Sequence, residues 1–154
     1  MSTLFVYSSN DEAINSLCRE SAFKKSKTQT LQLTPYSHKS ALSRFLGINR
    51  HHSRFSVYDV DFELFDRIII ACDELAGFIS PEVEEFISTN NFRYKNVDCI
   101  VFGEGRFVKK AQDSLKVKLS LSGGTVRNCV TVSAKEIKRE EEDLLFSVRH
   151  RLAV

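Results

Sequence analysis

The sequence predicts an α/β domain with a five-stranded parallel sheet, and three observations lead to that prediction. Apolar runs at residues 68–72 and 97–102, the second with Asp98 as its one polar residue, are typical of strands buried on both faces, as in a parallel sheet. Segments with apolar residues at helical spacing alternate with strand-like segments along the chain. Each of the two runs also leads through a loop into a helix, which is how parallel strands are connected. We expect one domain over residues 1–154.

The first half of the chain supplies two strands and one clear helix. Residues 4–7 form a short apolar strand, and apolar residues at helical spacing predict a helix over 11–23. A weaker strand at 31–33 is closed by Pro35. The stretch 35–57 is irregular, and we expect one short helix within it.

The second half repeats the strand–helix unit. The strand at 68–72 ends in an acidic loop with Gly77 as a flexible point. A helix then opens at Ser80-Pro81-Glu82, with a capping hydroxyl, a proline in the first turn and a carboxylate near the positive helix end. The strand at 97–102 ends at Gly103.

Three further elements complete the chain. Val108, Ala111 and Leu115 lie at helical intervals in a segment that we expect to be a helix over 107–119. Residues 126–132 alternate between apolar and polar side chains, which predicts a half-exposed strand. Ser133 and Glu136 have the spacing of a capping box for a final helix.

The composition of the strands indicates their order in the sheet. The first, third and fourth strands are apolar on both faces and belong in the centre, whereas the second and fifth carry polar residues and belong at the edges. This arrangement fits the order 2-1-3-4-5, in which ligands bind beyond the carboxyl ends of the first and third strands. The candidate site is therefore formed by residues 7–12, 73–77 and 103–106.

Charge and composition limit the class of function. Residues 59–92 carry nine acidic side chains against one basic one, which argues against nucleic acid at this site. No apolar run has the length of a membrane span, and the first residues lack a signal-peptide pattern, so we expect a cytoplasmic protein. The four cysteines stand singly, which predicts buried reduced thiols. No spacing indicates a metal site or a catalytic nucleophile.

With these elements in place, the chain resembles the flavodoxin-like family. The segment DRIIIAC-DELAGF-ISPEVEEF looks like the family's third strand, flavin-contacting loop and helix. VDCIVFGEG resembles the fourth strand with its glycine-containing flavin loop, and KREEEDLLFSVRHRL looks like the closing helix. The resemblance implies a three-layer sandwich, FMN as the cofactor and electron transfer with a redox or regulatory protein partner. It implies an electron carrier or binding module more than a hydrolase or transferase.

The resemblance also implies which residues hold the cofactor. The phosphate would lie at the loop after the first strand, and the isoalloxazine ring between the loops after the third and fourth strands. The candidate residues are Ser8, Ser9, Asn10, Asp11, Asp73, Glu74, Leu75, Ala76, Gly77, Gly103, Glu104, Gly105 and Arg106.

Three alternatives remain open from the residues. Ser9 and Glu12 have capping-box spacing, so the Glu12 carboxylate could bond the Ser9 amide and occupy the place that a phosphate needs. The chain could instead be a flavin-free interaction or regulatory module of the same fold, which meets a basic partner through its acidic face or an acidic one through the basic loop 49–54. A third hypothesis is a receiver-type phosphoacceptor at Asp73, with Asp11, Glu12 and Lys135 around it.

Overall fold

The computed structural model describes residues 2–23, 27–34, 58, 60–133 and 135–136. The elements in chain order are β1 (Thr3–Ser8), α1 (Glu12–Phe23), β2 (Thr28–Gln32), the 3-10 helix η1 (Phe62–Leu64), β3 (Arg67–Leu75), β4 (Phe78–Ile79), α3 (Pro81–Thr89), β5 (Asn96–Phe102), α4 (Val108–Leu121) and β6 (Thr125–Val132). Predictions for residues 35–57, including the basic loop 49–54, lie outside the described residues, as does the body of the final helix.

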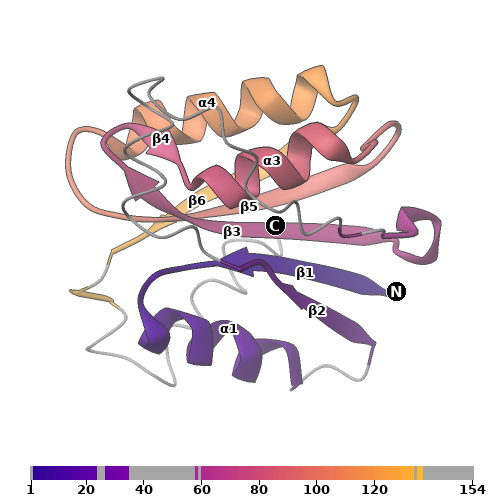
Figure 1. Cartoon of the computed structure of the whole chain (residues 1–154), viewed down its shortest axis with the longest axis horizontal. Helices are drawn as coiled ribbons and strands as arrows, with labels where there is room; N and C mark the ends of the chain where they lie inside the picture. Colours follow the sequence, from indigo (N-terminus) through magenta and orange to yellow (C-terminus); the bar gives the residue numbers. More distant parts are fainter. Residues whose placement is uncertain (1, 24–26, 35–57, 59, 134, 137–154) are drawn as a thin grey trace, which may run out of the picture.

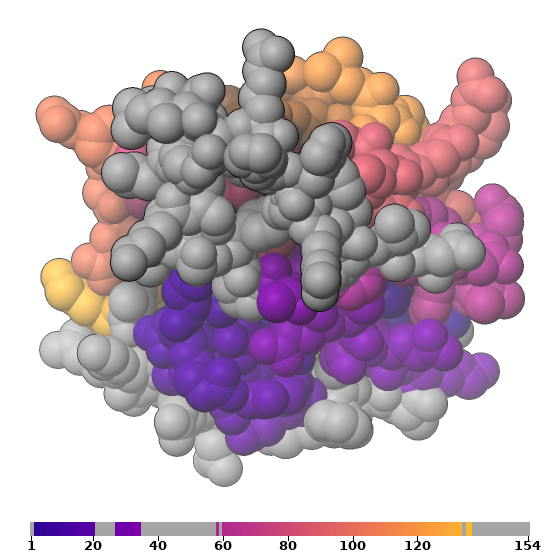
Figure 2. Space-filling view, in the orientation of Figure 1, coloured from indigo at the N-terminus to yellow at the C-terminus, as the bar shows by residue number. Residues whose placement is uncertain are grey.

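The sheet has the order β2-β1-β3-β5-β6, and all four neighbouring pairs on this path are parallel. The short strand β4 pairs antiparallel with β3 and lies off the path. Helix α1 covers one face of the sheet, and α3 and α4 cover the other (Figure 1). In the space-filling view, α1 and β2 form the indigo and violet lower part of the visible face, and α4 forms its orange upper edge (Figure 2). The predicted α/β class and strand order are confirmed.

Two hydrophobic cores explain why the central strands are apolar without alternation. Along β5, Val97, Cys99 and Val101 pack into the core under α3 and α4. The alternate residues Ile100 and Phe102 pack into the core under α1. Successive strand residues point to opposite faces, so a strand covered on both sides is apolar at most positions, and the one charged residue buried in β5, Asp98, is paired with Arg67. Burial of each such apolar side chain stabilises the fold by about 1.5–3 kcal/mol.

The helices present their apolar faces to these cores as their spacing predicts. Ile14, Leu17 and Cys18 of α1 lie in one core, and Ala111 and Leu115 of α4 lie in the other. Pro81 is at the first position of α3, as expected. The Ser80 hydroxyl, however, makes no capping bond to α3. Its Oγ is buried and has no hydrogen-bond partner among the described residues.

The cysteines are free thiols, as predicted. Cys18, Cys72 and Cys99 are buried, and Cys129 is half-buried. Burial raises the pKa of the Cys18 and Cys72 thiols, which keeps them protonated and unreactive.

The prediction that β3 ends at Cys72 is wrong. The strand continues to Leu75 and turns back into β4, with Leu75 opposite Phe78. Ala76 (φ 52°) and Gly77 (φ 88°) form the two-residue turn, and both are left-handed, as a tight hairpin turn requires. The acidic segment after Cys72 is therefore part of a hairpin, and Gly77 is a fixed turn residue rather than a flexible point.

The described part of the chain contains no helix that is long and apolar enough to cross a membrane. Ser133 and Glu136 form the predicted capping box: the Ser133 amide donates to the Glu136 carboxylate (2.7 Å), and the Glu136 amide donates to the Ser133 hydroxyl (3.2 Å).

Candidate functional site

The carboxyl ends of β1, β3 and β5 meet at one edge of the sheet. The parallel register places Ser8 of β1 beside Cys72 of β3, and Asp73 of β3 beside Phe102 of β5. The loops that follow these strands are therefore neighbours. The candidate residues 8–11, 73–77 and 103–106 are brought together as the sequence predicts, and what differs is how their side chains are used.

The loop after β1 converges on the carboxylate of Asp73. The Asp73 Oδ2 atom accepts a hydrogen bond from the Ser9 hydroxyl (2.9 Å) and another from the Asn10 amide (2.9 Å). The Ser9 Oγ in turn accepts from the Asp11 amide (3.0 Å). Hydroxyl and amide donors that point at one oxygen form an anion-binding loop, and here the anion is a side chain of the protein itself.

The second carboxylate oxygen of Asp73, Oδ1, differs from Oδ2 in its hydrogen bonding. Asp73 Oδ1 is buried and has no hydrogen-bond partner among the described residues. Burial raises the pKa of Asp73, and the nearby Glu82 and Asp11 carboxylates raise it further, whereas the bonds from Asn10 and Ser9 lower it. Asp73 thus combines one well-bonded oxygen with one buried acceptor that lacks a donor.

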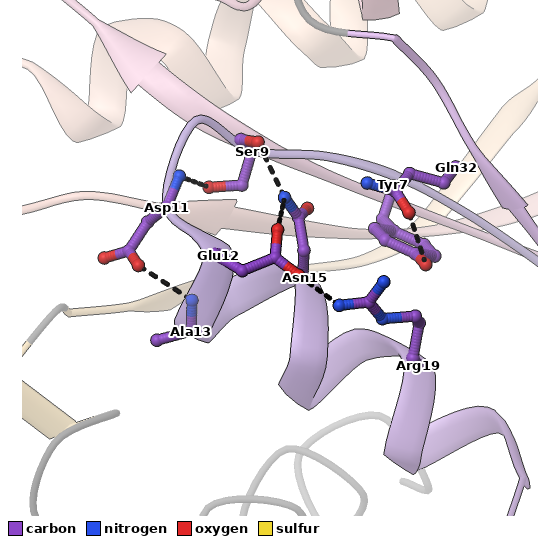
Figure 3. A network of polar contacts seen from close by, with 8 residues as sticks. All are labelled: Tyr7, Ser9, Asp11, Glu12, Ala13, Asn15, Arg19 and Gln32. Atoms are coloured by element: carbon purple, nitrogen blue, oxygen red, sulfur yellow. Dashed lines mark hydrogen bonds and ion pairs between the residues drawn. The ribbon is translucent and has the colours of Figure 1, made fainter.

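Asp11, and not Glu12, caps helix α1. The Asp11 Oδ1 atom accepts from the Ala13 amide (2.9 Å), and the Asn15 side chain donates to the Ser9 carbonyl (2.9 Å). Glu12 points along the helix and pairs with Arg19 (Figure 3). The expectation that Glu12 reaches back to the Ser9 amide is wrong, because the Arg19 guanidinium farther along the helix holds its carboxylate.

Ser8 lies deeper than a surface phosphate ligand. Its hydroxyl donates to the Glu82 carboxylate, and both residues are buried. Sequence reasoning placed Glu82 in the first turn of α3 but did not connect it to the loop after β1. The two residues are 74 positions apart in the chain, so no local spacing pattern links them.

The β3–β4 hairpin lies against the start of α4. The Glu74 carboxylate accepts from the Gly77 amide (2.6 Å), which braces the turn. A Cβ on Gly77 would approach the Lys110 side chain to 2.9 Å, and the Lys110 ammonium stands 4.9 Å from the centre of the Phe78 ring. Nothing in the sequence pattern linked Lys110 to the hairpin.

The loop after β5 packs against the hairpin on its other side. A Cβ on Gly103 would lie 2.8 Å from the Glu74 Cβ and 3.2 Å from the Val108 side chain, so only glycine fits between the two loops. Glu104 forms an ion pair with Lys135 (3.6 Å), which joins this loop to the segment after β6.

Beyond this contact the loop opens outward. A Cβ on Gly105 (φ 84°) would meet no atom of the described residues within 4 Å, and the Arg106 guanidinium lies 4.8 Å from the centre of the Phe107 ring. Phe78 and Phe107 are 42% and 43% exposed. Two aromatic rings are therefore half-exposed beside the two loops that follow β3 and β5.

The receiver-type arrangement does not assemble as a metal site. Within the described ranges, no group of three His, Cys, Asp or Glu side chains is placed to hold a metal ion. Lys135 pairs with Glu104, and the Asp73 carboxylate is engaged by Ser9 and Asn10.

No protein-family model and no curated protein sequence matches this chain. Solved structures do. A flavoprotein in complex with FMN from Lactobacillus acidophilus NCFM is 13% identical, with a TM-score of 0.68 over 84% of this chain and 92% of that one. The flavodoxin of Fusobacterium nucleatum, bound to flavin mononucleotide, is 12% identical, with a TM-score of 0.58 over 97% and 98%. The Trp repressor binding protein of Bacillus subtilis is 11% identical, with a TM-score of 0.56 over 99% and 96%. At these identities the likeness establishes the fold.

Proposed function

This chain has a flavodoxin-like fold, and we propose that it binds FMN at the loop edge of its sheet and carries electrons for a protein partner. The observation that supports this most is the convergence of the Ser9 hydroxyl and the Asn10 amide on a single oxygen after β1. Such a convergence is what a phosphate oxygen requires, and it lies at the point where the resemblance predicts the phosphate.

The residues that would hold the cofactor divide into two groups. Ser9 and Asn10 supply donors for an anion, while Ser8, through Glu82, fixes the end of β1 beneath them. The ring would lie between the hairpin turn and the outward part of the loop after β5. The candidate residues there are Leu75, Ala76, Gly77, Gly103, Glu104, Gly105 and Arg106.

The flavin would supply one- and two-electron transfer, and the protein would set its potential through nearby charge and backbone hydrogen bonds. Glu74 and Glu104 place negative charge beside the ring position, and Lys110 and Arg106 place positive charge there. Negative charge opposes the gain of electrons, so we expect Glu74→Gln to shift the midpoint potential of the bound flavin to a more positive value. A reductive titration of the loaded protein measures this shift.

Binding itself is tested by titrating FMN fluorescence with the purified protein. Ser9→Ala removes one donor to a charged group, so we expect FMN affinity to fall by about tenfold. Ser88→Ala is the matched control, because the Ser88 hydroxyl donates to the Glu85 carbonyl within α3 and lies outside the candidate site. Saturable quenching that Ser9→Ala weakens and Ser88→Ala leaves unchanged supports the proposal. Protein that quenches no FMN refutes it.

A flavin-free interaction module is the second candidate, and the Asp73 carboxylate favours it because it already fills the anion-binding loop. The Trp repressor binding protein, named for a protein partner, has the same fold. Of the acidic residues expected to meet a basic partner, Glu63 and Glu84 are exposed, whereas Glu82 is buried against Ser8. A colourless protein that neither quenches FMN nor gains colour with it supports this candidate.

A further inference from the structure

The position of Asp73 has a consequence for the kind of flavin that this site accepts. We propose that the Asp73 carboxylate competes with the terminal phosphate of a flavin nucleotide, so that the site takes a phosphate-free flavin of the riboflavin type at least as well as FMN. This inference rests on the proposed flavin function and specifies its ligand.

Asp73 already occupies the hydrogen-bond donors of the loop after β1. The Ser9 hydroxyl and the Asn10 amide both donate to Asp73 Oδ2, at 2.9 Å each. A phosphate that used the same donors would have to displace this oxygen or lie beside it. The two anions cannot share the donors, since each donor proton points at one acceptor.

The carboxylates around Asp73 disfavour a second anion at this loop. Asp11 lies on the same loop, and Glu82 reaches the base of the loop from α3 through Ser8. Both carboxylates act on Asp73 with the sign that disfavours further negative charge. A phosphate monoester carries up to two negative charges and would join three carboxylates. A ribityl chain that ends in a hydroxyl carries none.

The second oxygen of Asp73 calls for a hydrogen-bond donor. Asp73 Oδ1 is buried and has no partner among the described residues, so it is an acceptor that lacks a donor. A ribityl hydroxyl is a donor and can satisfy this oxygen. A doubly ionised phosphate offers acceptors only and leaves it unsatisfied. The unmet need at this position is therefore for a hydroxyl.

The test measures dissociation constants for riboflavin and for FMN in four proteins. Asp73→Ser empties the position and removes the charge. Asp73→Asn removes the charge but keeps the shape and the acceptor for Ser9 and Asn10. Asp11→Asn is the matched comparison, because it removes one charge from the same loop without emptying the Asp73 position.

For the wild-type chain we expect riboflavin to bind as tightly as FMN or more tightly. In Asp73→Ser the preference should move toward FMN by about tenfold or more, with a smaller move in Asp73→Asn. In Asp11→Asn the ratio of the two dissociation constants should change by less than about threefold. Wild-type protein that binds FMN about tenfold more tightly than riboflavin overturns the proposal, and so does a preference that both Asp73 variants leave unchanged.

Inorganic phosphate separates this inference from the flavin function itself. We expect added phosphate to raise the midpoint of thermal unfolding of Asp73→Ser but not that of the wild type. If no variant binds either flavin while phosphate stabilises Asp73→Ser alone, the flavin function fails and the competition by Asp73 stands. If phosphate stabilises the wild type as strongly as Asp73→Ser, the competition is refuted.

Discussion

Among single residues, Asp98 on β5 is a charged side chain that the core encloses, with 3% of its surface exposed. Arg67 of β3 donates to Asp98 Oδ2 (Nε 2.7 Å), and Asn128 of β6 donates to Oδ1 (2.9 Å). One carboxylate thus joins three neighbouring strands. We expect Asp98→Ala to lower the free energy of unfolding by about 3–5 kcal/mol, because it removes both the ion pair with Arg67 and the hydrogen bond from Asn128 at a buried position.

Urea denaturation measures this loss, and Asp113→Ala is the matched control. Asp113 pairs with Lys109 on the exposed surface of α4 (3.7 Å), where an ion pair contributes less than about 0.5 kcal/mol. Equal effects of the two substitutions would show that Asp98 is not the link that its contacts indicate.

Asp73 gives a second prediction at this scale, on the dependence of stability on pH. Burial raises the pKa of Asp73 in the folded chain, so the folded state binds more protons than the unfolded state above the ordinary aspartate range. The contribution of protonated Asp73 to the free energy of unfolding is therefore fully present at low pH. It is lost as the pH rises from the ordinary aspartate pKa through the raised pKa of the folded chain. The groups that face Asp73 are Asp11, Glu82 and Cys18, together with the adjacent Cys72.

The measurement is denaturant unfolding at a series of pH values for wild type and Asp73→Asn. In Asp73→Asn, the free energy of unfolding should not show the decline with rising pH that Asp73 causes. The difference in free energy of unfolding between the two proteins should therefore change steadily from the ordinary aspartate pKa to the raised pKa of Asp73. Parallel curves for the two proteins would contradict the assignment. Asp113→Asn is the control that should follow the wild type.

At the scale of elements, the β3–β4 hairpin is where local backbone conformation determines the shape of the site. Ala76 has a φ of 52°, which disfavours a residue with a side chain, and Gly77 has a φ of 88° with Lys110 at 2.9 Å from a Cβ position. We expect Ala76→Gly to raise the free energy of unfolding by about 0.5–1 kcal/mol and Gly77→Ala to lower it by about 1–2 kcal/mol. Thermal unfolding of the two variants checks the opposite signs. Equal signs would mean that the turn does not have this conformation.

The hairpin also explains where sequence reasoning fell short. The apolar runs predict β3 and β5 because burial on both faces leaves neighbouring positions apolar, with Asp98 as the one charged residue inside the run of β5. Asp73 and Glu74 interrupt the apolar run of β3, so the prediction ended β3 at Cys72. The strand continues because Glu74 and Leu75 pair with β4 across a two-residue turn, and Ala-Gly is not among the dipeptides that mark such turns most clearly. A two-residue antiparallel strand such as β4 is too short to produce an alternating pattern in the sequence.

At the scale of the whole molecule, the arrangement of strands fixes where the site lies, but side-chain pairing determines what it can hold. The order 2-1-3-4-5 follows from which strands are apolar on both faces, and the three loops converge as that order requires. The sequence does not reveal that Asp73, and not Glu12, supplies the internal anion. Asp73 is 63 positions from Asn10 along the chain, and only the parallel register of β1 and β3 brings them together.

The positions of the acidic residues can be predicted from the sequence, but their individual roles cannot. The acidic block 59–92 is visible in the sequence, yet its members have different roles: Glu84 pairs with Lys118 on the surface, Glu82 is buried against Ser8, and Asp73 fills the loop. Which acids remain available to a partner depends on the fold and cannot be read from their number.

The most direct test of a flavin site at this edge is an amide NMR titration of the isotope-labelled chain with FMN and with riboflavin. We predict saturable shifts of the amides of Asn10, Ala76 and Gly103 to Arg106, with the amides of Asn96 and Val97 at the opposite end of β5 unchanged. Shifts that are absent at saturating flavin, or that spread evenly over both ends of the sheet, would contradict the account.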